Sequence, residues 1–462
     1  MKKGDFYELD IIDMTKEGMG LGKVTLEEGK PPFTVFVEKG VYGETVRAGI
    51  TEVKKNYAKG KVVQVLKETP YLSDSICPNI DKCGGCGYGK LNYDAQLYLK
   101  EKQVKDKLER LAGIKNPSVN PIVPSDDTAH YRNKAKVFVY NDMVGFKERK
   151  SNMVVDCRVC QIQNDRAMAI CDSLRAFLKK QKQKNVIGTM VIRTTDEETM
   201  VVINRKGKAD YDWISLAYDM DDACGNTLES FYVDDRCIAG KKTILDEVAG
   251  LQFEVSPLSF YQVNRKTMVK LYDKAISYLD LKGDETVLDL YCGVGTIGIF
   301  ALKKMAEISG TTLTDVKGRV IGIESVKPAV IDANRNAVIN GIVNARYITG
   351  KAETELPAML GLTKLMKPNE VNELVEKEPE IKLESADYII LDPPRAGCEK
   401  DLLDAVITAK PKKISYISCD PGTLARDVKY LEENGYSFIE ATPFDMFPGT
   451  THVETVVLLS RA

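Results

Sequence analysis

The stretch VLDLYCGVGTIGI, residues Val287–Ile299, reveals most about the fold. Its first half has the composition of a buried strand and its second half that of a helix, with Gly293 and Gly295 in the turn between them. Glycines in such a turn let the backbone approach a nucleotide-like ligand, and the start of the helix offers free N–H groups. A Gly-x-Gly turn alone is only weak evidence for a nucleotide-binding site, so the residues at the ends of the neighbouring strands must be considered as well.

Two later strands end in residues that suit the same ligand. The run VIGIES carries Glu324, a carboxylate that could accept both ribose hydroxyls, and another strand ends in ILDPPRAG. Together these features favour an adenosyl cofactor. NAD is the rival, because GVGTIG also fits Gly-x-Gly-x-x-Gly. S-adenosylmethionine is preferred for three reasons. Asp289 lies near the end of the first strand, and the distance in sequence from Asp289 to Glu324 is longer than the roughly 20 residues typical of a dinucleotide-binding unit. A thiol also lies downstream, which hydride transfer does not need.

Strands and helices alternate from about residue 251 to the end of the chain, which predicts parallel βαβ units in a Rossmann-like, doubly wound sheet. Residues 1–66 carry short strands separated by glycine turns, typical of a small β-barrel. Residues 67–250 combine a cysteine-bearing loop, a helix, several strands and one further helix. We therefore expect an α/β multidomain protein with domains at 1–66, 67–250 and 251–462.

The composition is that of a soluble globular protein, with 462 residues, 44% hydrophobic and 29% charged. The start MKKGDFYELD lacks the apolar region of a signal peptide, and no window reaches the length of a membrane span. We expect a cytoplasmic protein without a membrane partner. In that compartment the 11 cysteines are expected to be thiols, ligands or nucleophiles.

The charge is unevenly distributed. A net charge of −2 argues against wholesale binding of a polyanion. Two basic stretches interleaved with aromatic residues, Arg47–Lys67 and His130–Lys150, nevertheless fit phosphate contacts and base stacking; solvated strand faces are the alternative. The acidic stretch Lys367–Asp387 is interpreted as a surface insertion between two core strands.

The decapeptide SCDPGTLARD, Ser418–Asp427, places Cys419 between an apolar run and a turn. A thiol at the end of a parallel strand lies where doubly wound sheets build their sites, and the next helix could favour the thiolate through its dipole and Arg426. A small buried side chain is the alternative. In THVETVVLLS, Glu454 shares a strand face with His452 and is a candidate base, or else a surface carboxylate.

Five motifs in this order, SFYQVN, LDLYCGVGTIG, ILDPPRAG, SCDPGTLARD and HVETVVLL, resemble the motif series of the RNA uracil-5-methyltransferase family. The first 66 residues resemble a TRAM domain, an OB-like RNA-binding barrel. The resemblance implies S-adenosylmethionine as methyl donor, Cys419 as nucleophile and Glu454 as base. The residues matching the cofactor site are Gln262, Tyr291, Gly293, Glu324 and Asp392.

The implied chemistry suits these residues. Carbon 5 of uracil is a poor nucleophile until a thiolate adds to carbon 6, and the carbon 5 proton must then leave to a base. A uracil in folded RNA must also be unstacked or flipped to be reached. The segment HYRNKAKV resembles the RNA-facing region of the family, with Arg132, Asn133 and Lys134 as contacts.

A second constellation consists of cysteines. Cys77, Cys83 and Cys86 in CPNIDKCGGC form a ligand pattern that needs a fourth thiol, which Cys157 or Cys160 could supply. From the spacing alone, zinc and an iron–sulfur cluster both remain open. The family resemblance implies a [4Fe–4S] cluster on the first three and Cys160, which would make the central domain an α+β iron–sulfur domain.

Other classes fit less well. Radical S-adenosylmethionine methylthiotransferases use Cys-x3-Cys-x2-Cys, which is not in this sequence, and DNA cytosine-5-methyltransferases place their thiol in a Pro-Cys dipeptide. Amino-methyltransferases would have NPPY where this chain has DPPR. A catalytically silent RNA-binding assembly factor is a further alternative. Because the barrel and cysteines resemble the bacterial 23S enzymes, we expect 23S ribosomal RNA as substrate, with transfer RNA as the alternative and no obligate protein partner.

Overall fold

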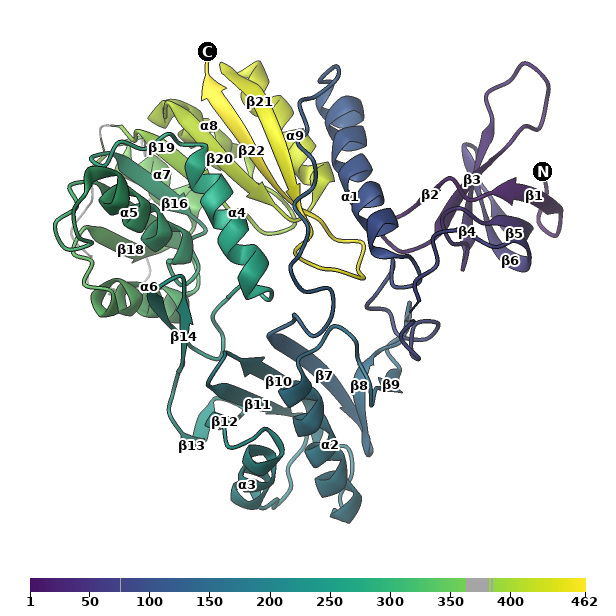
Figure 1. The fold of residues 1–462 in the computed structure, drawn as a ribbon, viewed down its shortest axis with the longest axis horizontal. Helices are drawn as coiled ribbons and strands as arrows, with labels where there is room; N and C mark the ends of the chain where they lie inside the picture. Colours follow the sequence, from purple (N-terminus) through teal and green to yellow (C-terminus); the bar gives the residue numbers. More distant parts are fainter. Residues whose placement is uncertain (75, 363–381, 384) are drawn as a thin grey trace, which may run out of the picture.

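The computed structural model describes residues 1–74, 76–362, 382–383 and 385–462. In the described residues, three large β-sheets with their helices succeed one another along the chain and form three lobes, and a two-stranded sheet lies between the second and third in sequence (Figure 1). The acidic insertion predicted at Lys367–Asp387 lies mostly outside the described residues. In the described part of the chain, no helix is both long and apolar enough to cross a membrane.

The first lobe is a small barrel. Its strands are β1 (Phe6–Asp10), β2 (Asp13–Met14), β3 (Gly20–Val24), β4 (Phe33–Glu38), β5 (Thr45–Val53) and β6 (Tyr57–Lys67), in the order β1-β5-β6-β4-β3-β2. The alternating sequence of β4 turns Val35 and Val37 inward, where both are fully buried. The sheet curls back on itself, since the N–H of Ile12 donates to the carbonyl of Leu21 at 2.9 Å. The N-terminal barrel expected from the sequence is present.

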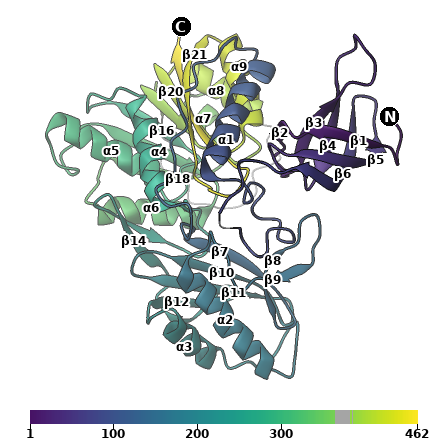
Figure 2. The same cartoon turned by 45° about the vertical axis from the view of Figure 1, so that its right-hand side comes forward.

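Helix α1 (Tyr93–Lys107) lies between the barrel and the C-terminal sheet in both views (Figures 1 and 2). The side chain of Asn92 caps its start, and a π-helical turn, Leu108–Ala112, prolongs it to Gly113, whose φ of 81° ends it. A fully buried ion pair joins α1 to the C-terminal lobe, with Lys100 Nζ 2.5 Å from Asp445 Oδ1.

The second lobe is a mixed sheet covered by two helices. Its strands are β7 (Lys134–Tyr140), β8 (Met143–Lys147), β9 (Val154–Asp156), β10 (Ile187–Thr194), β11 (Thr199–Arg205), β12 (Leu228–Val233) and β13 (Arg236–Gly240), in the order β13-β12-β11-β10-β7-β8-β9. The helices are α2 (Asp165–Lys180) and α3 (Trp213–Ala223). Only one helix was expected here, which was wrong. The aromatic and β-branched residues of α3 favour strands locally, but Asp212 caps the helix and burial of Leu216 and Met220 stabilises it.

The third lobe begins with a hairpin, β14 (Ile244–Val248) and β15 (Leu251–Val255), and helix α4 (Arg265–Ser277). Its sheet contains β16 (Thr286–Leu290), β17 (Arg319–Glu324), β18 (Ala345–Thr349), β19 (Tyr388–Leu391), β20 (Lys413–Ser418), β21 (Tyr436–Phe444) and β22 (Glu454–Arg461), in the order β18-β17-β16-β19-β20-β22-β21. The helices between the strands are α5 (Thr296–Ser309), α6 (Lys327–Ile339), α7 (Ala352–Met359), α8 (Lys400–Ala409) and α9 (Pro421–Glu433).

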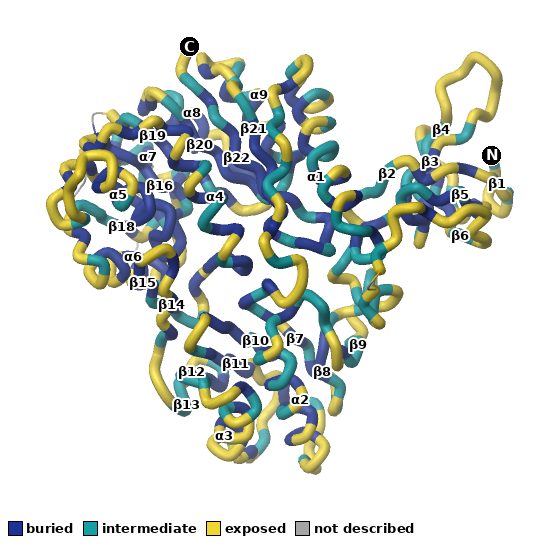
Figure 3. Tube along the Cα trace, viewed as in Figure 1, coloured by how far each residue is buried: buried dark blue, intermediate teal, exposed yellow. Residues whose placement is uncertain are grey.

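The expected doubly wound sheet is confirmed. Strands β16 to β20 run parallel, and β21 and β22 add an antiparallel hairpin at one edge. Helices α4, α5 and α6 pack on one face, while α7, α8, α9 and the end of α1 pack on the other. Figure 3 shows the sheet as the most continuous buried region of the molecule. The carboxyl ends of its parallel strands therefore share one edge.

Candidate active site

The predicted nucleophile and the predicted base are neighbours at this edge. Cys419 directly follows β20, and Glu454 is the first residue of β22. The two strands are antiparallel and pair Ser418 with Thr455, so the next positions along the ladder are Cys419 and Glu454. The sheet register thus brings together two residues that the sequence separates.

Burial makes both groups hold their protons more tightly than usual. Burial, followed by the nearby charge of Glu454, raises the pKa of the Cys419 thiol to about 12. Glu454 is only 4% exposed, and burial, followed by the charge of Asp392, raises its pKa to about 8. Burial likewise raises the pKa of Asp392 to about 7. Arg395 acts in the opposite direction and lowers the pKa of both Cys419 and Glu454.

Arg395 was missed in the sequence, and the expected role of Arg426 was wrong. The Arg426 guanidinium donates from Nη2 to the carbonyls of Ala396 and Cys398, both at 3.0 Å, so it supports the loop that carries Arg395. The cation beside the thiol is Arg395 itself, which hydrogen-bonds the Cys419 side chain. The signal was available, because Arg395 directly follows the two prolines of ILDPPRAG at the same sheet edge.

The thiol opens into a cavity of about 920 Å³. Arg395, Cys419 and His452 form one wall of this cavity. The opposite wall comes from the barrel and from α1, and it includes Leu21, Phe36, Gln103 and Lys107. We refer to this space as the catalytic cavity. It is built jointly by the first lobe, α1 and the third lobe.

The predicted cofactor residues follow β16 and β17 at the same edge. Tyr291 and Gly293 both have left-handed backbone, with φ of 65° and 55°, which turns the chain sharply after β16. The N–H of Gly293 donates to Glu324 Oε2 at 3.2 Å. The Tyr291 hydroxyl donates to Glu353, and both line a second cavity of about 220 Å³ beside the ends of β17 and β18. A planar ring could lie there with its ribose near Glu324.

Two other buried residues support the glycine turn. Gln262 is 4% exposed and lies on the segment between β15 and α4, which crosses over the turn: a Cβ at Gly293 would lie 3.8 Å from the Phe260 carbonyl. Asp289 is fully buried, and burial raises its pKa to about 7. Its Oδ2 accepts from the N–H of Gly298 at 2.9 Å, so Asp289 braces the start of α5.

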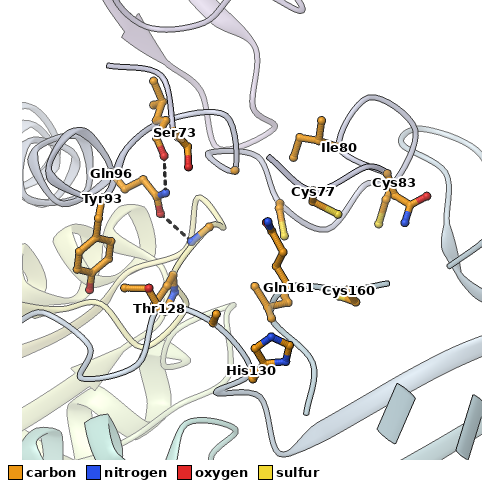
Figure 4. A pocket seen from close by; sticks show the side chains of 18 of the residues that line it. Ser73, Cys77, Ile80, Cys83, Tyr93, Gln96, Thr128, His130, Cys160 and Gln161 are labelled. Carbon is orange, nitrogen blue, oxygen red and sulfur yellow. Dashed lines mark hydrogen bonds between the residues drawn. The ribbon is translucent and has the colours of Figure 1, made fainter. Parts of the chain in front are cut away.

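The four predicted cluster ligands line one further cavity, of about 310 Å³ (Figure 4). We call it the cysteine cavity; its thiols are those of Cys77, Cys83, Cys86, Cys157 and Cys160. The sulfur of Cys160 accepts from the backbone N–H groups of Ile162 and Gln163. The Cys157 side chain hydrogen-bonds the sulfur of Cys160, and it also lies 3.4 Å from Asn79 Nδ2 and 3.2 Å from the Val159 carbonyl. Across the described residues, no group of three ligands is arranged to hold a metal ion.

The segment Asp445–Val453 connects the cysteine cavity with the catalytic cavity. Gly449 lines the cysteine cavity, and its carbonyl accepts from the N–H of Tyr88 at 3.0 Å. Three residues later, His452 lines the catalytic cavity. The Thr451 hydroxyl donates to the Lys16 carbonyl at 2.6 Å, which ties the same segment to the barrel.

The predicted RNA contacts lie where the second and third lobes meet. Burial and the neighbouring Arg193 and Arg132 lower the pKa of Lys134 to about 8. Asn133 is 8% exposed, and its Nδ2 donates to the Gln262 carbonyl at 3.0 Å, so it bridges the two lobes. Of the three predicted contacts, Arg132 and Lys134 are partly exposed and basic, whereas Asn133 is buried.

Comparison with known proteins agrees with this geometry. The tRNA (uracil-5-)-methyltransferase family model matches residues 92–462, and the TRAM domain model matches residues 2–63. The chain is 36% identical to an uncharacterized RNA methyltransferase of Caldanaerobacter subterraneus and 34% identical to one of Bacillus cereus, covering all of this chain and 99% and 98% of theirs. Its fold resembles the Pyrococcus abyssi tRNA (uracil-54, C5)-methyltransferase in complex with S-adenosyl-L-homocysteine, with a TM-score of 0.69, 25% identity and coverage of 98% of this chain and 100% of that one.

Proposed function

Because the chain belongs to the S-adenosylmethionine-dependent RNA uracil-5-methyltransferase family, we propose that it methylates carbon 5 of a specific uridine in 23S ribosomal RNA. The observation that carries this proposal is the placement of Cys419 next to Glu454, at the sheet edge shared with the cofactor residues. We further propose a division of labour between domains at residues 1–66, 67–250 and 251–462, in which the first two bind RNA and the third performs the chemistry.

In the proposed reaction, Cys419 attacks the uracil ring as the thiolate and Glu454 removes the carbon 5 proton. The Cys419 sulfur forms a bond to carbon 6 of the uracil, and the ring electrons move to carbon 5 and the carbonyl oxygen. Arg395 beside the sulfur favours the thiolate. S-adenosylmethionine, held by the residues around Glu324 and Tyr291, would supply the methyl group for carbon 5. Glu454 then takes the carbon 5 proton, and the electrons expel the Cys419 thiolate.

The residues proposed to hold S-adenosylmethionine surround the two turns after β16 and β17. Glu324 would accept the ribose hydroxyls, and Tyr291 would pack against the adenine in the smaller cavity. Gly293 would let the cofactor approach the backbone. Asp392, whose charge acts on Cys419, and Gln262, on the segment that crosses over the glycine turn, would contact the rest of the cofactor.

For the cysteine cavity we propose a [4Fe–4S] cluster bound by Cys77, Cys83, Cys86 and Cys160. Each thiolate of such a cluster binds a different iron, so four ligands surround more space than they would around one zinc ion. A cavity of about 310 Å³ lined by all four thiols fits this requirement. The backbone N–H groups directed at Cys160 are donors of the kind that tune cluster sulfurs, and its neighbour Cys157 donates to the same sulfur, which favours Cys160 as the fourth ligand.

The substrate is tested with labelled S-adenosylmethionine, unmodified 23S ribosomal RNA and transfer RNA, followed by nuclease mapping. We expect labelled 5-methyluridine in the ribosomal RNA and none with Cys419→Ala, which should still bind RNA. Label only in transfer RNA would favour the second candidate, supported by the solved tRNA methyltransferase of the same fold. Absence of label in both would overturn the proposed activity and favour an RNA-binding assembly factor.

A further inference from the structure

The catalytic cavity is much larger than its proposed target. At about 920 Å³, it approaches the upper end of the range, roughly 300–1,000 Å³, of pockets that enclose drug-sized molecules. A uracil ring is far smaller than such a molecule. A uracil held against Cys419 therefore leaves room in the cavity for a further part of the RNA strand.

The barrel wall presents an apolar platform. Leu21 on β3 and Phe36 on β4 are paired directly across the sheet, and both line the cavity. Phe36 is half-buried and in T-shaped contact with Tyr57, with ring centroids 5.4 Å apart. An aromatic ring that lines a cavity and is held by a second ring is suited to stacking with a nucleobase.

Polar groups beside the platform are free to contact a ligand. Gln103 Oε1 on α1 is buried without a hydrogen-bond partner in the described part of the chain, which is costly unless a ligand donates to it. One turn further along α1, the exposed Lys107 lines the same cavity. No carboxylate of the described residues lies within ion-pair distance of Lys107, so its charge is available to a phosphate.

We propose that this wall is a second nucleobase subsite, which binds a base adjoining the target uridine. The base stacks on Phe36 and Leu21, donates an N–H to Gln103 Oε1, and its phosphate lies near Lys107. This subsite rests on the proposed function and deepens it: the barrel then takes part in choosing the uridine through a neighbouring base, in addition to any role in general RNA binding.

The test uses single-stranded pentanucleotides with a central uridine and the fluorescent base 2-aminopurine on either side of it. Binding to the full-length protein should quench the fluorescence from one of the two positions through stacking. Phe36→Ala should abolish this quenching and weaken binding roughly 5- to 150-fold, the range found for loss of one base–aromatic stack. Phe36→Leu, which keeps an apolar side chain in the barrel, should lose the quenching while remaining folded.

Phe6→Ala is the matched control, because Phe6 is an exposed aromatic residue of the same barrel and does not line the cavity. Phe6→Ala should leave both the quenching and the affinity within about twofold of the wild-type values. Gln103→Leu should reduce the preference between flanking bases. An abasic residue at the quenched position should weaken binding in the wild type but not further in Phe36→Ala, as expected for two groups in direct contact.

The outcomes separate this proposal from the proposed function. Quenching that depends on Phe36 in a protein that methylates no RNA would keep the subsite and overturn the activity. Methylation that proceeds with Phe36→Leu and Phe6→Ala equally, or absence of quenching from both positions, would overturn the subsite and leave the activity intact.

Discussion

Nη2 of Arg395 lies 3.1 Å from Nε2 of His452, at the wall of the cavity that contains the Cys419 thiol. Burial, followed by the charge of Arg395, lowers the pKa of His452 to about 4, so the imidazole is neutral at physiological pH and accepts from the guanidinium. No carboxylate of the described chain forms an ion pair with Arg395. Its charge is therefore available to the sulfur.

Arg395→Gln should make Cys419 less reactive. An opposite charge at this range lowers a pKa by about 1–3 units, so its loss should reduce the thiolate about tenfold or more at a fixed pH. The measurement is alkylation of Cys419 by iodoacetamide at pH 8, followed by peptide-resolved mass spectrometry. Arg395→Lys should retain much of the rate. Equal rates in wild type and Arg395→Gln would show that the guanidinium does not act on the thiol.

Glu454→Gln should trap the reaction after methyl transfer. Without a base for the carbon 5 proton, the bond between Cys419 and carbon 6 cannot be broken by elimination. We expect a labelled protein–RNA adduct that survives denaturing electrophoresis, and none with Cys419→Ala. Turnover by Glu454→Gln at the wild-type rate would assign the proton to another group.

The rate of the wild type should depend on the ionisation of Glu454. Its pKa is raised to about 8, so the carboxylate that accepts the proton becomes abundant only as the pH rises toward 8. Breakdown of the covalent adduct, followed in a single turnover, should speed up from pH 6 to pH 8 and level off above it; the overall rate can keep rising, because the pKa of the Cys419 thiol is raised to about 12. A rate already constant at pH 6 would contradict this assignment, once RNA binding has been shown to be saturated at each pH.

The same raised pKa affects stability. The unfolded chain releases the Glu454 proton near pH 4.5, whereas the folded protein keeps it until about pH 8, so this group's contribution to stability falls as the pH rises through that window. Glu454→Gln removes the effect. Its melting temperature relative to wild type should rise between pH 5 and pH 8, and a constant difference would exclude a buried proton on Glu454.

Cys160→Ser and Cys157→Ser form a matched pair for the cysteine cavity. The proposal predicts about four iron and four sulfide per chain in wild type purified without oxygen, loss of both in Cys160→Ser, and retention in Cys157→Ser, whose thiol already bonds Asn79 and the Val159 carbonyl. Zinc in the wild type, or loss of iron only in Cys157→Ser, would require a different ligand set.

Lys100→Met should be strongly destabilising, because it leaves Asp445 buried and unpaired. Breaking one side of a buried ion pair costs about 3–5 kcal/mol. Lys105→Met, at an exposed position of the same helix, is the control. The free energy of unfolding of each variant is measured in urea, with a spectroscopic probe in the third lobe reporting the transition. Replacing both partners with Lys100→Met and Asp445→Leu should recover part of the loss.

Several parts of the site could be predicted because they depend on local rules. Parallel strands end at one edge, so Cys419, Glu324 and Asp392 were expected together from their positions after apolar runs. The family resemblance and the S-adenosylmethionine-dependent class are confirmed by the comparisons. The choice of 23S ribosomal RNA, the cluster and the residue roles stay predictions.

Other parts of the site depend on packing between distant segments and could not be predicted from the sequence. Arg426 and Arg395 are both arginines near the thiol, and only the tertiary structure directs one to backbone carbonyls and the other to the sulfur. The barrel lies at the opposite end of the chain from Cys419, so no local pattern could place Phe36 in the cavity that contains Cys419. Helix α3 was missed because its residue preferences and its tertiary packing disagree.

The segment Asp445–Val453 is fixed at several points along its length, at Gly449 by Tyr88, at Thr451 by Lys16 and at His452 by Arg395. Surface loops usually tolerate insertions and deletions, because their closure entropy changes slowly with length. Here one added or lost residue between Gly449 and Glu454 would shift either the wall of the cysteine cavity or the start of β22. The length of this connection is therefore more tightly constrained by the structure than its amino-acid sequence.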